Sequence, residues 1–140
     1  MSAPGAGYSG TPLPRKLGIK PGAKLVLVNA PAGFDETLGE LPAGVVVRRR
    51  AQGAGFDVIV AFCKRAAQLE RGLPGWRAAL DQAGGLWIAW PKRASGIDTD
   101  LGDGVVRDVG LAAGLVDNKV CAIDATWSGL RFVYRLSDRR

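Results

Sequence analysis

The chain has 140 residues, 47% of them hydrophobic, which is the size and composition of one folded domain. It carries 19 lysines and arginines against 13 acidic residues, and this net charge of +6 favours anionic partners. The absence of histidine excludes Ser–His–Asp and Cys–His catalysis and any histidine-based metal site. No apolar run is long enough for a bilayer and no signal peptide begins the chain, so we expect a cytoplasmic protein without membrane contact.

The N-terminal residues 1–12 are rich in Gly, Ser and Pro, and we expect them to be flexible. One domain is expected over residues 13–140. Pro14 predicts a helical turn that ends at Gly18. Asp35 is predicted to cap a short helix that runs to Leu41, because its carboxylate can accept the free amides of the first turn.

The remaining apolar runs predict strands and helices in alternation. Strands are expected over residues 24–29, 45–48, 56–62, 86–90, 116–124 and 130–136. Gly84 and Gly85 are interpreted as the turn before the fourth strand. Helices are expected over residues 64–82, either kinked or divided into two short helices near Gly72 and Pro74, and over 101–112 with the apolar stripe Leu101, Val105, Val109 and Ala112.

The last predicted strand alternates strictly between apolar and polar residues, which is typical of an antiparallel strand joined by a hairpin to the one before it. The pattern predicts an α/β fold: a three-layer Rossmann-like sandwich with a mainly parallel central sheet of about six strands, ending in an antiparallel hairpin. Such an ending is similar to the class I methyltransferase fold. Fold similarity alone does not determine function.

The two sequence signals of a dinucleotide-type cofactor site are missing. The first strand is followed by Asn29-Ala30-Pro31-Ala32-Gly33 and not by GxGxxG. The second strand ends in Arg48-Arg49-Arg50, which cannot accept hydrogen bonds from ribose hydroxyls and would repel a sulfonium. We therefore expect no S-adenosylmethionine or NAD site, and no cofactor.

Basic residues follow the ends of several predicted parallel strands. Besides the three arginines, Lys64-Arg65 and Lys92-Arg93 lie in such positions. Because these ends share one edge of the sheet, the residues and nearby loop amides form a candidate anion site. The alternative is that these cations only keep the strand ends solvated.

The segment from Asp98 to Asp103 lacks the ligand spacing of a calcium loop, so no metal site is expected. Thr99 or Asp100 is predicted to cap the helix that follows. Trp127 is expected in the hairpin turn, where it either stacks on a ligand or covers the edge of its own sheet. The two cysteines, Cys63 and Cys121, are expected to be buried free thiols.

The chain resembles a bacterial family catalogued as domain of unknown function 3052. The matching stretches are Tyr8–Leu13, Lys16–Lys20, Trp90-Pro91-Lys92 with Ser95, Thr99-Asp100-Leu101, Gly114–Asp117, Lys119–Ala122, and Trp127–Leu130 with Phe132. The resemblance implies a Rossmann-like domain and no assigned activity. It directs attention to the polar part of these stretches, namely Lys92, Ser95, Asp100, Lys119 and Trp127.

From these observations we predict a non-catalytic binding domain for an anionic small molecule or an acidic protein surface. The candidate ligand-binding residues are Lys64, Lys92, Arg93, Ser95, Asp100, Lys119, Trp127 and Arg131. One alternative is a reduced methyltransferase-like enzyme with a non-standard cofactor site. Another is a nucleic-acid-binding protein. The identity of the ligand, the oligomeric state and the role of the N-terminal segment are left open.

Overall fold

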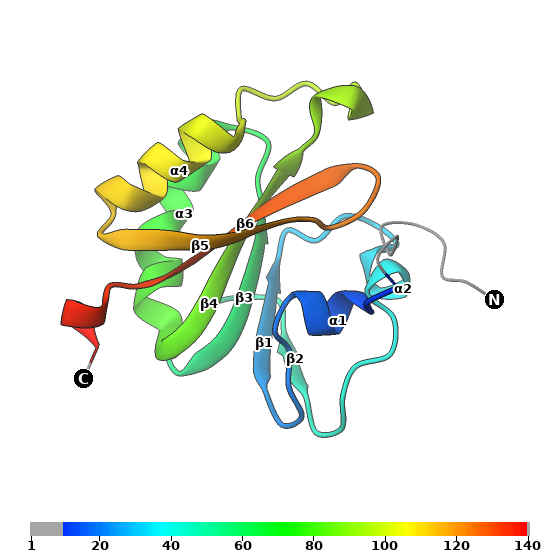
Figure 1. Ribbon diagram of the computed structural model, residues 1–140, viewed down its shortest axis with the longest axis vertical. Helices are drawn as coiled ribbons and strands as arrows, with labels where there is room; N and C mark the ends of the chain where they lie inside the picture. The colour runs from blue at the N-terminus through cyan, green and yellow to red at the C-terminus, as the bar shows by residue number, and fades with distance from the viewer. Residues whose placement is uncertain (1–9, 140) are drawn as a thin grey trace.

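The computed structural model describes residues 10–139, so most of the predicted flexible segment 1–12 lies outside the described residues. Its centre is a six-stranded sheet in the order β2-β1-β3-β4-β6-β5 (Figure 1). The strands are β1 (Lys24–Val28), β2 (Val46–Arg48), β3 (Phe56–Phe62), β4 (Leu80–Pro91), β5 (Leu115–Ala122) and β6 (Trp127–Tyr134). Strands β1 to β4 pair in parallel, and β6 runs antiparallel to both β4 and β5. The mainly parallel sheet with a terminal antiparallel hairpin is therefore confirmed.

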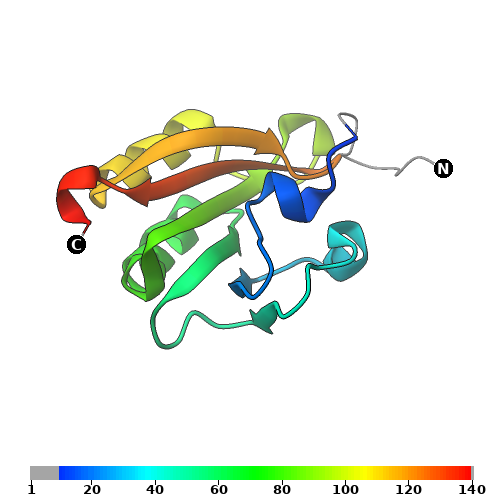
Figure 2. The ribbon, with the colours of Figure 1, turned by 60° about the horizontal axis from the view of Figure 1, so that its bottom comes forward.

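Helices lie on both faces of this sheet (Figures 1 and 2). They are α1 (Leu13–Lys16), α2 (Phe34–Leu38), α3 (Ala66–Ala79) and α4 (Asp103–Ala112), with short 3₁₀ turns at Arg93–Ser95 and Leu136–Asp138. Apolar residues of α3 and α4 pack with Leu86, Ile88 and Trp90 of β4, whereas α2 and the residues after α1 pack with Trp87 and Ala89. Successive side chains of a strand point to opposite faces, so β4 contributes to both cores.

Strand β4 begins six residues earlier than predicted, and Gly84 and Gly85 lie inside it rather than in a turn. At Gly84 backbone atoms leave no room for a side chain, and at Gly85 the end of a long side chain occupies that space. A Cβ at Gly84 would lie 2.9 Å from the carbonyl oxygens of Phe56 and Asp57. A Cβ at Gly85 would lie 2.3 Å from Nε of Arg131. Glycine here marks close approach within the sheet.

The alternative of two short helices was wrong, because α3 is one continuous helix with Pro74 inside it. Gly72 lies against the indole ring of Trp76, since a Cβ there would be 2.3 Å from Cζ2 of that ring. The absence of a side chain at Gly72 therefore leaves room for the Trp76 ring, which is buried together with Leu69 and Leu73. The apolar packing of this face outweighs the missing amide of the proline.

Two predicted caps were also wrong. Helix α2 follows Gly33, which has the left-handed φ of 83°, and Asp35 lies within its first turn, paired to Arg49 at 2.9 Å. Helix α4 follows Gly102, without a side-chain cap. The buried face of α4 carries Val106 and Gly110, so the predicted stripe was wrong in part.

No helix in the part of the chain that the structure describes has the length and apolarity required to span a membrane.

Candidate functional site

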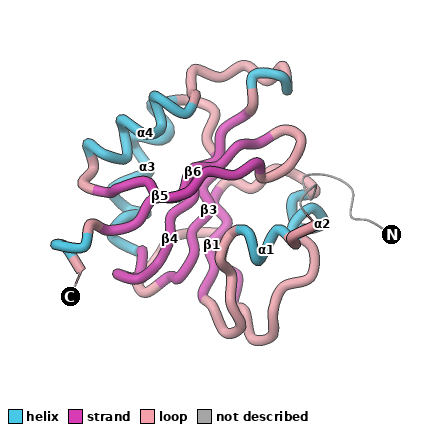
Figure 3. Tube along the Cα trace, viewed as in Figure 1, coloured by secondary structure: helices cyan, strands magenta, loops and turns pink. Residues whose placement is uncertain are grey.

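The chain reverses its direction of travel across the sheet between β1 and β3. Strand β1 leads to β2 on one side, and β3 leads to β4 on the other. The connections that follow these two strands therefore diverge at their carboxyl ends, and open α/β sheets bind ligands at such points. These connections are loops at the same edge of the sheet (Figure 3).

A hollow of about 610 Å³ lies at this point, a size suited to a small organic ligand. We call it the carboxyl-end hollow. It is lined by Asn29, Pro31, Ala32, Phe34, Thr37, Phe62, Lys64, Gln68, Ile97, Asp124, Thr126 and Trp127. Three of the lining rings form a continuous aromatic wall: Phe62 lies edge-on to Phe34, with ring centroids 4.8 Å apart, and edge-on to Trp127, with centroids 5.1 Å apart.

Polar groups from separate segments complete the lining. Asn29 follows β1 with a φ of 58°, the left-handed region that residues other than glycine rarely adopt. Such conformations concentrate at functional sites. Lys64 and Gln68 come from the β3–α3 connection and the first turns of α3, and Asp124 from the β5–β6 turn.

Asp124 is the only carboxylate among the described residues that line the hollow. Its Oδ1 accepts the amide protons of Thr126 and Trp127, both at 2.8 Å, and these two hydrogen bonds form the tight β5–β6 turn. Its Oδ2 has no hydrogen-bond partner within residues 10–139. One oxygen thus shapes the turn while the other is available to a ligand.

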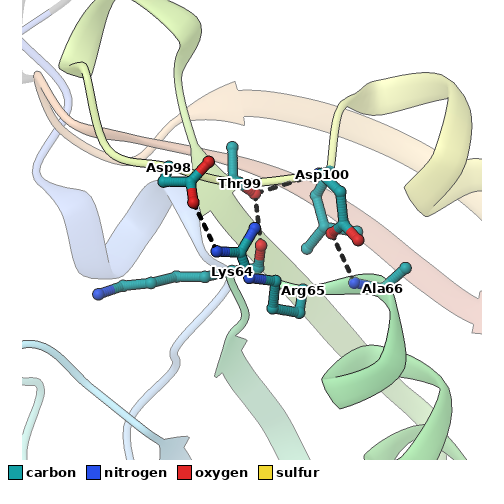
Figure 4. Close-up of polar contacts among 7 residues, drawn as sticks. Lys64, Arg65, Ala66, Asp98, Thr99 and Asp100 are labelled. Carbon is teal, nitrogen blue, oxygen red and sulfur yellow. Dashed lines mark hydrogen bonds and ion pairs between the residues drawn. The ribbon is translucent and has the colours of Figure 1, made fainter.

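The connection between β4 and α4 is fastened onto the start of α3 (Figure 4). Thr99 Oγ1 donates to the Lys64 carbonyl at 2.6 Å, Arg65 pairs with Asp98 at 2.7 Å, and Asp100 Oδ1 accepts the amide proton of Ala66 at 2.8 Å. Hydrogen bonding to Arg65, and then its charge, lowers the pKa of Asp98. These contacts hold the segment that brings Ile97 to the hollow.

This geometry corrects the prediction for Asp100. The residue was expected to cap the helix that follows it, but it caps α3, whose first amide it accepts. Gln68 accepts the amide proton of Lys64 at 3.0 Å. The predicted anion site needed free loop amides. The amides of Lys64 and Ala66 are already hydrogen-bonded to side chains, so these two are not available to an anion.

The predicted site residues fall into separate groups. Lys64 and Trp127 line the carboxyl-end hollow, and Figure 4 shows the Lys64 side chain extending away from the Arg65–Asp98 pair. Lys92, Arg93 and Ser95 lie at the end of β4, where Ser95 Oγ donates to the Lys92 carbonyl at 2.7 Å.

The last two predicted residues, Lys119 and Arg131, are cross-strand neighbours in the middle of the β5–β6 hairpin, away from the hollow. Trp127 begins β6 and is only 5% exposed. It covers its own sheet, which was one of the two alternatives.

Sequence reasoning missed Asn29, Gln68 and Asp124 as lining residues. Asn29 carried a signal, since an asparagine between a buried strand and a proline-glycine segment is suited to the left-handed conformation. Asp124 and Gln68 carried none, because only the fold brings them to the end of β1.

The residues near the hollow also limit its chemistry. Cys63, directly after β3, is a free thiol whose burial raises its pKa to about 12, so it stays protonated and is not a nucleophile. Among residues 10–139 no group of three acidic or cysteine side chains is placed to hold a metal ion.

A larger hollow of about 1340 Å³ lies beside the first, between α1, α2 and the 123–126 segment. The two share Thr37, Asp124 and Thr126. The larger one lies off the point where the strand order reverses, which favours the carboxyl-end hollow as the principal site.

No family model and no curated protein matches this chain. Solved structures do. A putative type 11 methyltransferase from Sulfolobus solfataricus is similar with a TM-score of 0.61 and 14% identity, over 91% of this chain and 92% of that one. A ribosomal protein L11 methylase from Lactobacillus delbrueckii subsp. bulgaricus is similar with a TM-score of 0.60 and 13% identity, over 88% of this chain and 75% of that one. A SAM-dependent methyltransferase from Aquifex aeolicus has a TM-score of 0.57 and 14% identity, over 84% of this chain and 85% of that one.

The fold is the Rossmann-like methyltransferase fold. At these identities the likeness shows the fold of the chain and no more. Our main functional prediction, a non-catalytic domain that binds an anionic small molecule or an acidic protein surface, finds no support and is corrected, because the structures that share the fold are methyltransferases. Their fold agrees better with the methyltransferase-like alternative.

Proposed function

We propose that the chain is a reduced methyltransferase-like enzyme that binds S-adenosylmethionine in the carboxyl-end hollow through non-standard contacts. The observation that carries the proposal is the position of that hollow, at the divergence of β1 and β3 in a methyltransferase fold. The proposal replaces our expectation that no cofactor is bound, which was based on two missing sequence signals.

The residues present fit the cofactor, although not in the usual way. The end of β2 still lacks a carboxylate, and Arg49 there is occupied by Asp35. Asp124 instead brings a carboxylate oxygen to the hollow, suited to a ribose hydroxyl or an ammonium group. The aromatic wall around Phe62 is suited to the flat adenine ring.

Lys64 gives the hollow a cation as well. Its ammonium is suited to the carboxylate of the methionine part of the cofactor, while Asp124 offsets its charge near the sulfonium. When bound, S-adenosylmethionine supplies a methyl group activated by a positively charged sulfur. The larger hollow shares Thr37, Asp124 and Thr126 with the carboxyl-end hollow. We propose that the methyl acceptor binds in the larger hollow and reaches the cofactor past these three residues.

Two further assignments belong to this proposal. The motifs from Tyr8 to Phe132 support membership of domain of unknown function 3052. The free thiols of Cys63 and Cys121 support a cytoplasmic location, because reduced cysteines are typical of that compartment.

Calorimetric titration with S-adenosylmethionine tests the cofactor proposal, and Asp124→Asn is the informative variant. Asparagine keeps an oxygen that can accept the two turn amides but removes the charge offered to the ligand. We expect saturable binding to the parent protein and a loss of affinity of about tenfold or more in the variant, the usual worth of a hydrogen bond to a charged group.

Asp81→Asn is the matched control, since Asp81 also accepts a nearby amide proton, that of Ala83 at 3.0 Å, but lies near the start of β4, away from the hollow. Its affinity should equal that of the parent. The proposal fails if the parent shows no saturable binding, or if the two variants bind equally well.

A further inference from the structure

One face of the β5–β6 hairpin is not covered by a helix. Leu130 and Phe132 of β6 point toward α3 and α4, with whose residues they form one core. The intervening positions Gly129 and Arg131 point the other way and pair with Cys121 and Lys119 of β5. Helix α1 reaches only the carboxyl end of this second face, where Lys16 Nζ donates to the Ala122 carbonyl at 3.1 Å. The hairpin lies at the front of Figure 1.

Cations gather on this uncovered face. Burial raises the pKa of the Cys121 thiol, and the nearby charges of Lys16, Lys119 and Lys92 oppose that rise. Lys16, Lys119 and Lys92, from α1, β5 and the end of β4, thus lie near this part of the hairpin, and Lys16 contacts it directly through the Ala122 carbonyl.

Arg131 continues this face along β6, and Arg139, after the C-terminal 3₁₀ turn, donates from Nε to the Tyr134 carbonyl at the end of the strand at 3.3 Å. The guanidinium of Arg131 lies against Gly85, and Nη1 donates to Asn118 Oδ1 at 3.4 Å. Its pKa is lowered by partial burial and then by the charge of Arg139. Within residues 10–139 the ion pairs are Arg49–Asp35, Arg65–Asp98 and Arg107–Asp117, so none of them neutralises this face.

We propose that this cationic face, defined by Lys16, Lys92, Lys119, Arg131 and Arg139, binds the phosphodiester backbone of a nucleic acid. Mutually repelling cations without acidic partners are stabilised by an external anion, and their spread over two strands favours a polymer over a single small ion. Residues on one face of a strand recur about every 7 Å, comparable to the spacing of backbone phosphates. The proposal is independent of cofactor binding.

Fluorescence anisotropy with a labelled 20-nucleotide single-stranded DNA, without S-adenosylmethionine, tests this surface. Five phosphate contacts predict a slope of log K against log salt of about −3.5, or about 100-fold weaker binding at 200 mM than at 50 mM salt. The Lys92→Gln/Lys119→Gln double variant should bind more weakly and reduce the slope to about −2.

Arg48→Gln/Arg50→Gln is the matched control, because it removes two charges at the opposite edge of the sheet, where β2 ends. It should keep the slope of the parent. Equal losses in the two double variants would show that net charge alone drives binding and would overturn the proposal. So would the absence of binding at 50 mM salt, or tighter binding to phosphatidylserine vesicles than to DNA.

Discussion

The Trp87→Ala protein is expected to lose about 4 kcal/mol of folding free energy, a large part of the roughly 5–15 kcal/mol by which a domain is stable. Trp87 is fully buried at the centre of β4, and it packs with residues of β1, β3 and α2. Its indole Nε1 donates to the Leu17 carbonyl at 3.0 Å, which ties the segment after α1 to the sheet. Alanine would leave a large cavity and an unpaired buried carbonyl.

Trp87→Phe separates these two contributions. Phenylalanine fills much of the space but cannot donate to Leu17, so we expect an intermediate loss of about 1–3 kcal/mol. Urea unfolding followed by circular dichroism measures both variants. A loss below about 1 kcal/mol for the alanine variant would mean that the residues around Leu17 do not pack on the sheet as described.

The Gly110→Ala variant is expected to lose about 1–3 kcal/mol, because α4 lies directly on β6 at this glycine. A Cβ there would lie 2.1 Å from Cε1 of Phe132, which is fully buried and cannot move aside cheaply. The helix would have to move away from the sheet. Thermal and urea unfolding give the measurement.

Gly104→Ala is the control within the same helix, because a Cβ there meets no atom within 4 Å. Alanine has the higher helix propensity, so this variant should gain up to about 1 kcal/mol. If the free energy of unfolding changed with the same sign in Gly110→Ala and Gly104→Ala, the result would contradict the packing of α4 on Phe132.

Apolar runs were sufficient to predict most of the sheet. Strand β3 was predicted with its observed bounds, 56–62, and Trp87 and Trp90 lie on opposite faces of β4 as strand alternation requires. The start of β4 was missed because Gly84 and Gly85 are typical of turns. Their real role depends on Asp57 and on Arg131, contacts between strands that no local pattern shows.

The candidate site was predicted only in outline. The basic residues do follow the carboxyl ends of parallel strands, and Lys64 does line the hollow at one of those ends. Asn29 and Asp124 meet there from positions almost a hundred residues apart, so tertiary structure alone brings them together. The missing GxGxxG and the basic end of β2 argued against a cofactor, but these signals describe only one way of binding it, and our proposal assigns the binding to other residues of the carboxyl-end hollow.

A crystal structure of the protein grown with S-adenosylhomocysteine tests the assignment of the carboxyl-end hollow most directly. We expect adenosyl density beside Asn29 and Phe62, with a ligand group within hydrogen-bond distance of Asp124 Oδ2. Density confined to the larger hollow between α1 and α2, or no ligand at saturating concentration, would contradict it.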